Sequence, residues 1–176
     1  MATVDARNRL QPALLDRLTD EAPGERQEAD DHRVMSKAQL RQAVLRDLSA
    51  LFNTVQPLGA AADAYPLVSA SVLNFGLPAL SGQLASRLDV SVLERTIRQA
   101  ILRFEPRILA DSLQVRAVEP SSVLDTHNVI EFEISGHLWS QPVPLEILLR
   151  TQMDLEAGQV EVRDGSSSSR QLATRT

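Results

Sequence analysis

The spacing of apolar residues changes near residue 105 from a helical period to strict alternation, and this change constrains the fold more than any other feature. Before it, two long segments repeat apolar side chains every three or four residues, as one face of an amphipathic helix requires. Ser36 with Gln39, and Ser91 with Glu94, form capping-box patterns that predict where these two helices begin. The first half of the chain is therefore predicted to be helical.

After that point the apolar residues alternate with polar ones, which is typical of strands that have one buried and one wet face. The alternating segments are 113–117, 130–138, 145–155 and 160–162, and the last two flank a tight turn at Ala157-Gly158. Successive strands joined by short turns predict an antiparallel meander. The expected class is α+β: a small meander of about four strands packed against two to three helices.

The chain divides into an arm, a domain and a tail. Residues 1–35 form the N-terminal arm, in which Pro12 opens a short helix and an acidic linker follows from Asp20 to His32. Residues 36–164 form the folded domain, and the serine-rich tail 165–176 is expected to be disordered. The short helix is either a docking motif on a flexible arm or a segment that folds back onto its own domain.

Composition excludes several classes of function. The net charge is −5 and no basic block stands out, which argues against a protein that binds nucleic-acid phosphates. Aromatic residues make up 3% of the chain, too few for a surface that stacks bases. The absence of cysteine rules out thiolate chemistry, and neither a signal peptide nor a membrane span is visible. We expect a soluble cytoplasmic protein.

Catalytic and metal-binding patterns are weak. No phosphate-binding glycine loop and no G-x-S-x-G motif occurs, and His32, His127 and His137 lack the spacing of metal ligands. Glu131 and Glu133 share the polar face of one strand at roughly 7 Å, within the range of paired glycosidase carboxylates. Both glutamates face the same solvent, however, so their surroundings do not divide them into an acid and a base. A solvated sheet face is the favoured interpretation.

The triplet Glu105-Pro106-Arg107 follows the second long helix. Proline moves the preceding residue out of the helical region, so Glu105 is predicted to be extended, with its carboxylate on the same side as the Arg107 guanidinium. Such a pair is a structural clamp, a docking point or a catalytic fragment. Because no further acid, histidine or metal cluster joins it, the triplet is not expected to be part of a catalytic site. A local salt bridge and a docking point remain.

Several stretches together resemble TssE, the baseplate subunit of type VI secretion systems, which is similar to the wedge protein of contractile-tailed phages often labelled lysozyme-like. The likeness runs from about residue 10 to residue 163 and is specific because its motifs occur in the expected order. The stretches that carry it are 12–18, 46–54, 65–78, 104–108 and 155–160.

This resemblance implies a small α+β fold without enzymatic activity, cofactor, metal or small-molecule substrate. It implies a structural component that links the wedge proteins TssF, TssG and TssK to the start of the TssB–TssC sheath. The expected place is the cytoplasmic side of the inner membrane. The same resemblance implies partner-binding roles for Glu105, Pro106, Arg107, Leu14, Leu15, Arg17 and Leu18, and fold-shaping roles for Asn53, Asn74, Gly76 and Pro78.

The sequence is also compatible with two other functions. The first is an anti-adaptor of the same fold that binds a response regulator and protects a sigma factor from proteolysis. The second is a muramidase that depends on Glu131 or Glu133. The Pro12–Leu18 segment favours the baseplate interpretation, since it resembles a tethered motif for a larger assembly.

Overall fold

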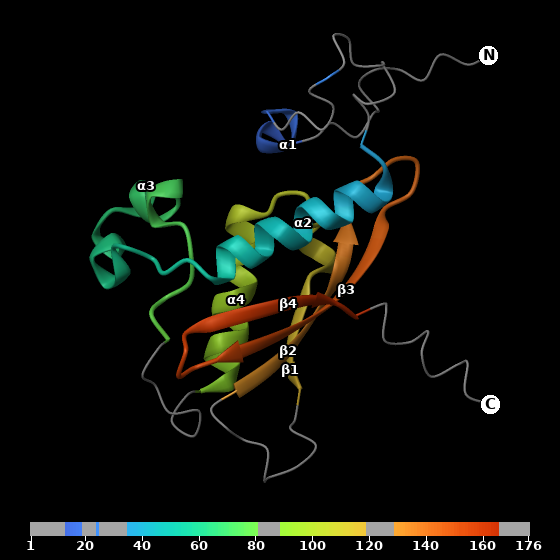
Figure 1. The fold of residues 1–176 in the computed structure, drawn as a ribbon. Helices are drawn as coiled ribbons and strands as arrows, with labels where there is room; N and C mark the ends of the chain where they lie inside the picture. Colours follow the sequence, from blue (N-terminus) through green and yellow to red (C-terminus); the bar gives the residue numbers. More distant parts are fainter. Residues whose placement is uncertain (1–12, 19–23, 25–34, 81–88, 119–128, 166–176) are drawn as a thin grey trace, which may run out of the picture.

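The computed structural model describes residues 13–18, 24, 35–80, 89–118 and 129–165. Within these residues the chain forms one antiparallel sheet with two long helices packed across one of its faces (Figure 1). The predicted α+β class is confirmed. The helical and alternating halves of the sequence form the two layers of this fold.

The sheet is a four-stranded meander. Its strands are β1 Gln114–Val118, β2 Val129–Leu138, β3 Leu145–Asp154 and β4 Gln159–Asp164, in chain order and each antiparallel to the next. The buried residues of β3 are Ile147, Leu149, Thr151 and Met153, every second position of the strand, as the alternation predicted. Between β3 and β4, Gly158 has a φ of +65°, which suits glycine in the predicted turn.

The first long helix, α2 Lys37–Phe52, begins as predicted. The Ser36 hydroxyl accepts the N–H of Gln39 at 3.2 Å, and the Gln39 side chain accepts the N–H of Ser36 at 2.8 Å. This reciprocal capping box satisfies two amides that a helix start leaves without partners. Pro57 and Gly59 predict that this helix ends near Asn53, and Asn53 is its C-cap.

The second long helix, α4 Val90–Phe104, has a different cap from the predicted one. Asp89, and not Ser91, is the N-cap, and its carboxylate accepts the N–H groups of Ser91 and Val92 at 2.9 and 3.3 Å. Glu94, the expected partner of Ser91, instead accepts the N–H of Ala117 in β1 at 2.7 Å. The predicted capping box is wrong because Asp89, two residues earlier and an equally good cap, accepts the first amides of the helix.

The core lies between the helices and the inner face of the sheet, and it is almost wholly aliphatic. Phe132 of β2 is its largest fully buried side chain. The fully buried aliphatic residues around it are Val44, Leu48, Leu51, Ile97, Ile101, Ile134, Leu138, Ile147, Leu149 and Leu155. They come from both helices and from the central strands, so no layer is stable without the other.

Between α2 and α4 the chain makes an excursion through short helical pieces, η3 Gly59–Ala64, α3 Pro66–Ser69 and η4 Val72–Asn74 (Figure 1). In the sequence, Pro66 at the start and Gly76 and Pro78 after the end predict one short helix over about 66–74. Ser71 interrupts it, because its hydroxyl donates to the Val68 carbonyl at 2.8 Å and accepts the N–H of Leu73 at 3.2 Å. Serine side chains that bond nearby backbone compete with helix continuation in this way.

Of the N-terminal arm, the structure describes α1 Leu14–Leu18, which lies beside α2 (Figure 1). Pro12, the acidic linker apart from Gly24, and the tail from Ser166 lie outside the described residues. None of the helices in the described part of the chain is both long and apolar enough to cross a membrane.

Candidate functional site

The Glu105-Pro106-Arg107 triplet forms a tight turn where α4 ends. Glu105 leaves the helical region, with φ −122° and ψ 76°, as the following proline requires. Its carbonyl then accepts the N–H of Ile108 at 3.2 Å, which closes a β-turn with Pro106 in the position that proline favours. The predicted extended geometry of the triplet is therefore wrong, because this hydrogen bond folds the segment back on itself.

The two charged side chains of the triplet nevertheless meet. Arg107 Nε donates to Glu105 Oε1 at 2.7 Å, and Arg107 Nη2 donates to Glu105 Oε2 at 2.5 Å. The backbone N–H of Arg107 also donates to Oε1, at 3.2 Å. Glu105 is only 3% exposed, whereas 24% of the Arg107 side chain is exposed. The bidentate pair therefore has a buried acid and a base that reaches the surface.

The turn is fastened to the end of β2. The N–H of Leu109 donates to the His137 carbonyl, and the N–H of Trp139 donates to the Arg107 carbonyl, both at 2.8 Å. Trp139 is itself half exposed beside the turn. The backbone of the triplet is thus held from α4 on one side and from the sheet on the other, which fixes the direction of the Arg107 guanidinium.

A third charged residue joins from α2. Asp47 Oδ2 accepts a hydrogen bond from Arg107 Nη2 at 2.6 Å, across 60 positions of sequence. Burial by itself lowers the pKa of Arg107, but the hydrogen bonds and charges of Glu105 and Asp47 outweigh burial and raise that pKa above its ordinary value. Arg107 therefore stays fully charged between two carboxylates.

The network continues to α1 through Arg46. Arg46 Nε donates to Asp47 Oδ1 at 2.9 Å, and Arg46 Nη1 donates to Asp16 Oδ1. The hydrogen bond from Arg46 lowers the pKa of Asp16, against the opposing effect of burial, and the charge of Arg107 adds to the lowering. We call the sequence of alternating charges Asp16, Arg46, Asp47, Arg107 and Glu105 the charged row.

The charged row joins the two regions that the resemblance marked as partner-binding. In α1, Asp16 points to the body of the protein, while Leu14, Leu15 and Leu18 are 72%, 60% and 74% exposed. The backbone of Arg17 belongs to α1, and its side chain lies outside the described part of the structure. Of the two alternatives for this segment, the structure shows it lying on its own domain, with its apolar side chains turned away.

Sequence reasoning missed Asp16, Arg46 and Asp47 as members of this site. Arg46 and Asp47 are neighbours on α2, where a charged pair ordinarily indicates a solvated face. The sequence does carry one indication of their role, since both residues belong to the stretch 46–54 that carries the family resemblance. Without the fold, nothing brings α2 next to the triplet.

The residues expected to shape the fold do so around the excursion after α2. The Asn53 side chain donates to the Val160 carbonyl at 2.8 Å and accepts the Val160 N–H at 2.9 Å, which joins α2 to β4. Gly76 has a φ of +122°, and a Cβ there would lie 2.3 Å from a backbone oxygen of the loop. Asn74 is buried and Pro78 is exposed. These contacts are structural, as the resemblance implied for Asn53 and Gly76.

The fold does not bring the candidate catalytic residues together into a site. Glu131 and Glu133 lie on the sheet face opposite the helices, and Glu131 accepts a hydrogen bond from a glutamine of β3 at 2.6 Å. His137 is exposed on β2, while His32 and His127 lie outside the described residues. Among the residues that the structure describes, no group of three or more His, Asp or Glu side chains is placed to hold a metal ion.

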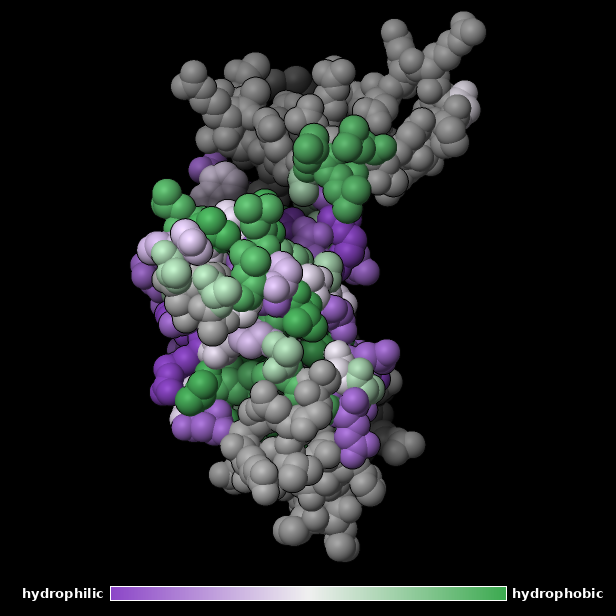
Figure 2. Space-filling view, turned by 90° about the vertical axis from the view of Figure 1, so that its left-hand side faces the viewer, coloured by the Kyte–Doolittle hydropathy of each residue, from purple (hydrophilic) through white to green (hydrophobic). Residues whose placement is uncertain are grey.

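Large apolar side chains are exposed on the excursion. Tyr65, Leu67, Val72 and Leu73, from α3, η4 and the residue before α3, are between 65% and 88% exposed. Figure 2 shows hydrophobic side chains gathered on this side of the molecule. Arg103 of α4 donates to a carbonyl of α3 at 2.9 Å, so this surface is attached close to the triplet. Exposed apolar groups of this size are typical of surfaces that bind other proteins.

An α+β domain with a preorganised charged turn and exposed apolar side chains defines a binding module that works by contact with other proteins. The family model described as baseplate wedge protein gp25 matches residues 38–143. The chain therefore belongs to the gp25 baseplate wedge family, the family that also contains TssE. No curated protein and no solved structure matches the chain. Membership indicates a structural role in a baseplate, through protein–protein contacts.

Proposed function

We propose that this chain is a TssE-like component of a type VI secretion baseplate. In this role it links the wedge subunits TssF, TssG and TssK to the first TssB–TssC sheath subunits on the cytoplasmic side of the inner membrane. It acts without catalysis, metal or cofactor. The observation that carries the proposal is the family match over residues 38–143, which includes the Glu-Pro-Arg turn and the α2 residues that support it.

The geometry supports different roles for the buried and the exposed members of the proposed partner-binding residues. Glu105 is buried and holds Arg107 in place, while Pro106 and Arg107 reach the surface. Arg107 Nε and Nη2 already donate to Glu105 and Asp47, so Nη1 is the nitrogen that remains to donate to a partner carboxylate, from a guanidinium that is already held in place. Leu14, Leu15 and Leu18 add an apolar face. We propose that partners contact Pro106, Arg107 and α1, with Glu105 as the buried support.

The test replaces Arg107 by lysine, because lysine keeps the positive charge next to Glu105 but lacks the planar fork. In a strain that assembles the system, we expect Arg107→Lys to abolish fluorescent TssB sheaths. Charge reversal at Glu105 is a poor test, since a cation at a site 3% exposed would unfold the domain.

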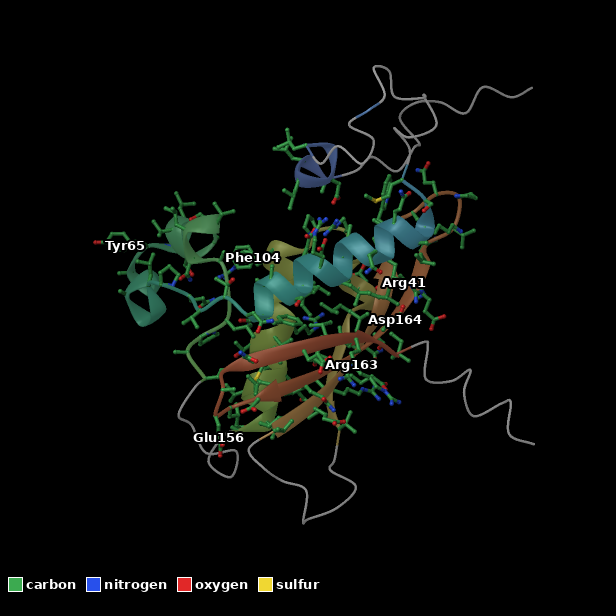
Figure 3. The ribbon with its side chains drawn as sticks, viewed as in Figure 1. Arg41, Tyr65, Phe104, Glu156, Arg163 and Asp164 are labelled. Atoms are coloured by element: carbon green, nitrogen blue, oxygen red, sulfur yellow. The ribbon has the colours of Figure 1, made fainter. Side chains whose placement is uncertain are left out.

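Arg41→Lys is the matched control. Arg41 is also 24% exposed in its side chain, and its Nη1 pairs with Asp164 at 2.9 Å, far from the triplet (Figure 3). Equal sheath assembly by both variants, with both folded, would exclude a docking role for Arg107. Purification of the tagged chain with a response regulator would support the anti-adaptor, and cell-wall clearing lost in Glu131→Gln or Glu133→Gln would support a muramidase.

A further inference from the structure

The attachment of α1 to the domain is electrostatic and incomplete. Asp16 forms the described ion pair of α1 with the body, through Arg46. The second carboxylate oxygen, Oδ2, is buried without a hydrogen-bond partner among the described residues. The three leucines of α1 gain little from this position because most of their surface stays in solvent. Segments with few buried apolar contacts open locally at a small cost in free energy.

The charged row makes this balance depend on the triplet. Asp16 and Arg107 share no hydrogen bond, but the two residues between them alternate in sign. Loss of positive charge at Arg107 leaves Arg46 as the described cationic partner of Asp47, so Asp47 draws the Arg46 side chain toward itself and away from Asp16. It also removes a direct attraction, since Arg107 helps to hold Asp16 ionised.

We propose that the charged row couples α1 to the Glu-Pro-Arg turn, so that a partner carboxylate bound to Arg107 weakens the attachment of α1 and releases it. The inference rests on the proposed docking role of these two elements. Coupling of this kind is reciprocal: a partner that draws α1 away leaves Arg46 available to Asp47 and Arg107 more available to an incoming acid. The partner that binds Arg107 and the partner that binds α1 then favour each other's binding.

The chain offers a clean way to measure the position of α1, because it contains no cysteine. Leu18→Cys and Gln42→Cys place two spin labels on exposed positions of α1 and α2. Double electron–electron resonance then gives the fraction of molecules with α1 attached, as a short and narrow distance distribution. The full-length isolated chain is used throughout.

The coupling predicts opposite effects for two neutralised charges. Arg107→Gln lowers the ratio of attached to detached α1 by about two- to fivefold, the range expected for partly exposed ion pairs. Asp47→Asn raises the ratio, because it removes the acid that competes with Asp16 for Arg46 and keeps an oxygen that accepts from Arg46. Arg107→Lys, which preserves the charge, leaves the ratio as in the wild type.

Arg163→Gln is the matched control, since it removes an arginine paired with Glu161 on β4. An equal effect of Arg107→Gln and Arg163→Gln, or a lowered ratio in Asp47→Asn, would overturn the coupling. Should Arg107→Gln fail to fold, Glu105→Gln with Arg107→Gln removes the buried unpaired acid and is expected to give the same lowered ratio. Sheath imaging of Arg107→Lys tests the docking role separately, since that variant keeps α1 attached.

Discussion

The three residues of the triplet have different physical roles. Glu105 is inaccessible, and its two oxygens are both used by Arg107. Arg107 is shared between this acid and Asp47 while part of its side chain reaches solvent. Pro106 sets the turn that brings the pair together. Two charges that look equally exposed in the sequence are thus one buried acid and one partly exposed base.

For the single residue Arg107, replacement by alanine should lower the free energy of unfolding by about 3 kcal/mol, because it leaves the Glu105 carboxylate buried without its partner. Urea denaturation measures the change. Arg163→Ala, which removes an exposed ion pair on the sheet, should change the stability little. Adding Glu105→Gln to Arg107→Ala should recover part of the loss. A further loss in the double variant would show that the buried charge is not the cause.

Among the elements, α1 stands apart because, in the part of the chain that the structure describes, an ion pair of Asp16 joins it to the body. The pKa of Asp16 is lowered from its ordinary value of 3.8, first by the hydrogen bond from Arg46. A lowered pKa in the attached state means that ionised Asp16 stabilises attachment above the ordinary pKa. That contribution is lost as the pH falls through the lowered value.

Carbon-detected NMR titration of the Asp16 carboxyl should therefore give a midpoint below 3.8 in the wild type. In Arg46→Gln the midpoint should return toward the ordinary value, because the main cause of the lowering is gone. Detachment of α1, followed by the label distance, should track the same midpoint. A midpoint unchanged by Arg46→Gln would show that this ion pair does not form in solution.

Elements were predictable from sequence wherever a repeating pattern decided them. The alternation in β3 and the capping box at Ser36 are local, and both are found as predicted. The α4 cap was missed because Asp89 and Ser91 are both good caps and sequence does not rank them. The charged row could not be predicted from the sequence. Asp47 and Arg107 are 60 positions apart, and the packing of α2 brings them together.

In the whole molecule, helices and sheet share one core, so the domain should unfold as one cooperative unit. Trp139, the single tryptophan, reports on the turn, while far-ultraviolet circular dichroism reports on α2 and α4. Both signals should give the same urea midpoint. Phe132→Ala should shift both by an equal amount, with a loss of about 4 kcal/mol. Separate midpoints would indicate independent subdomains.

Both ends of α2 are tied to the last hairpin of the chain. Arg41 pairs with Asp164, 123 positions later (Figure 3). The Asn53 side chain forms hydrogen bonds with the backbone of Val160, 107 positions later. Contacts that close such long loops form late and slow the folding of a domain. During synthesis, α2 leaves the ribosome early but cannot make these contacts until β4 has emerged. The helix that carries Arg46 and Asp47 is thus fixed against the sheet only once the domain is nearly complete.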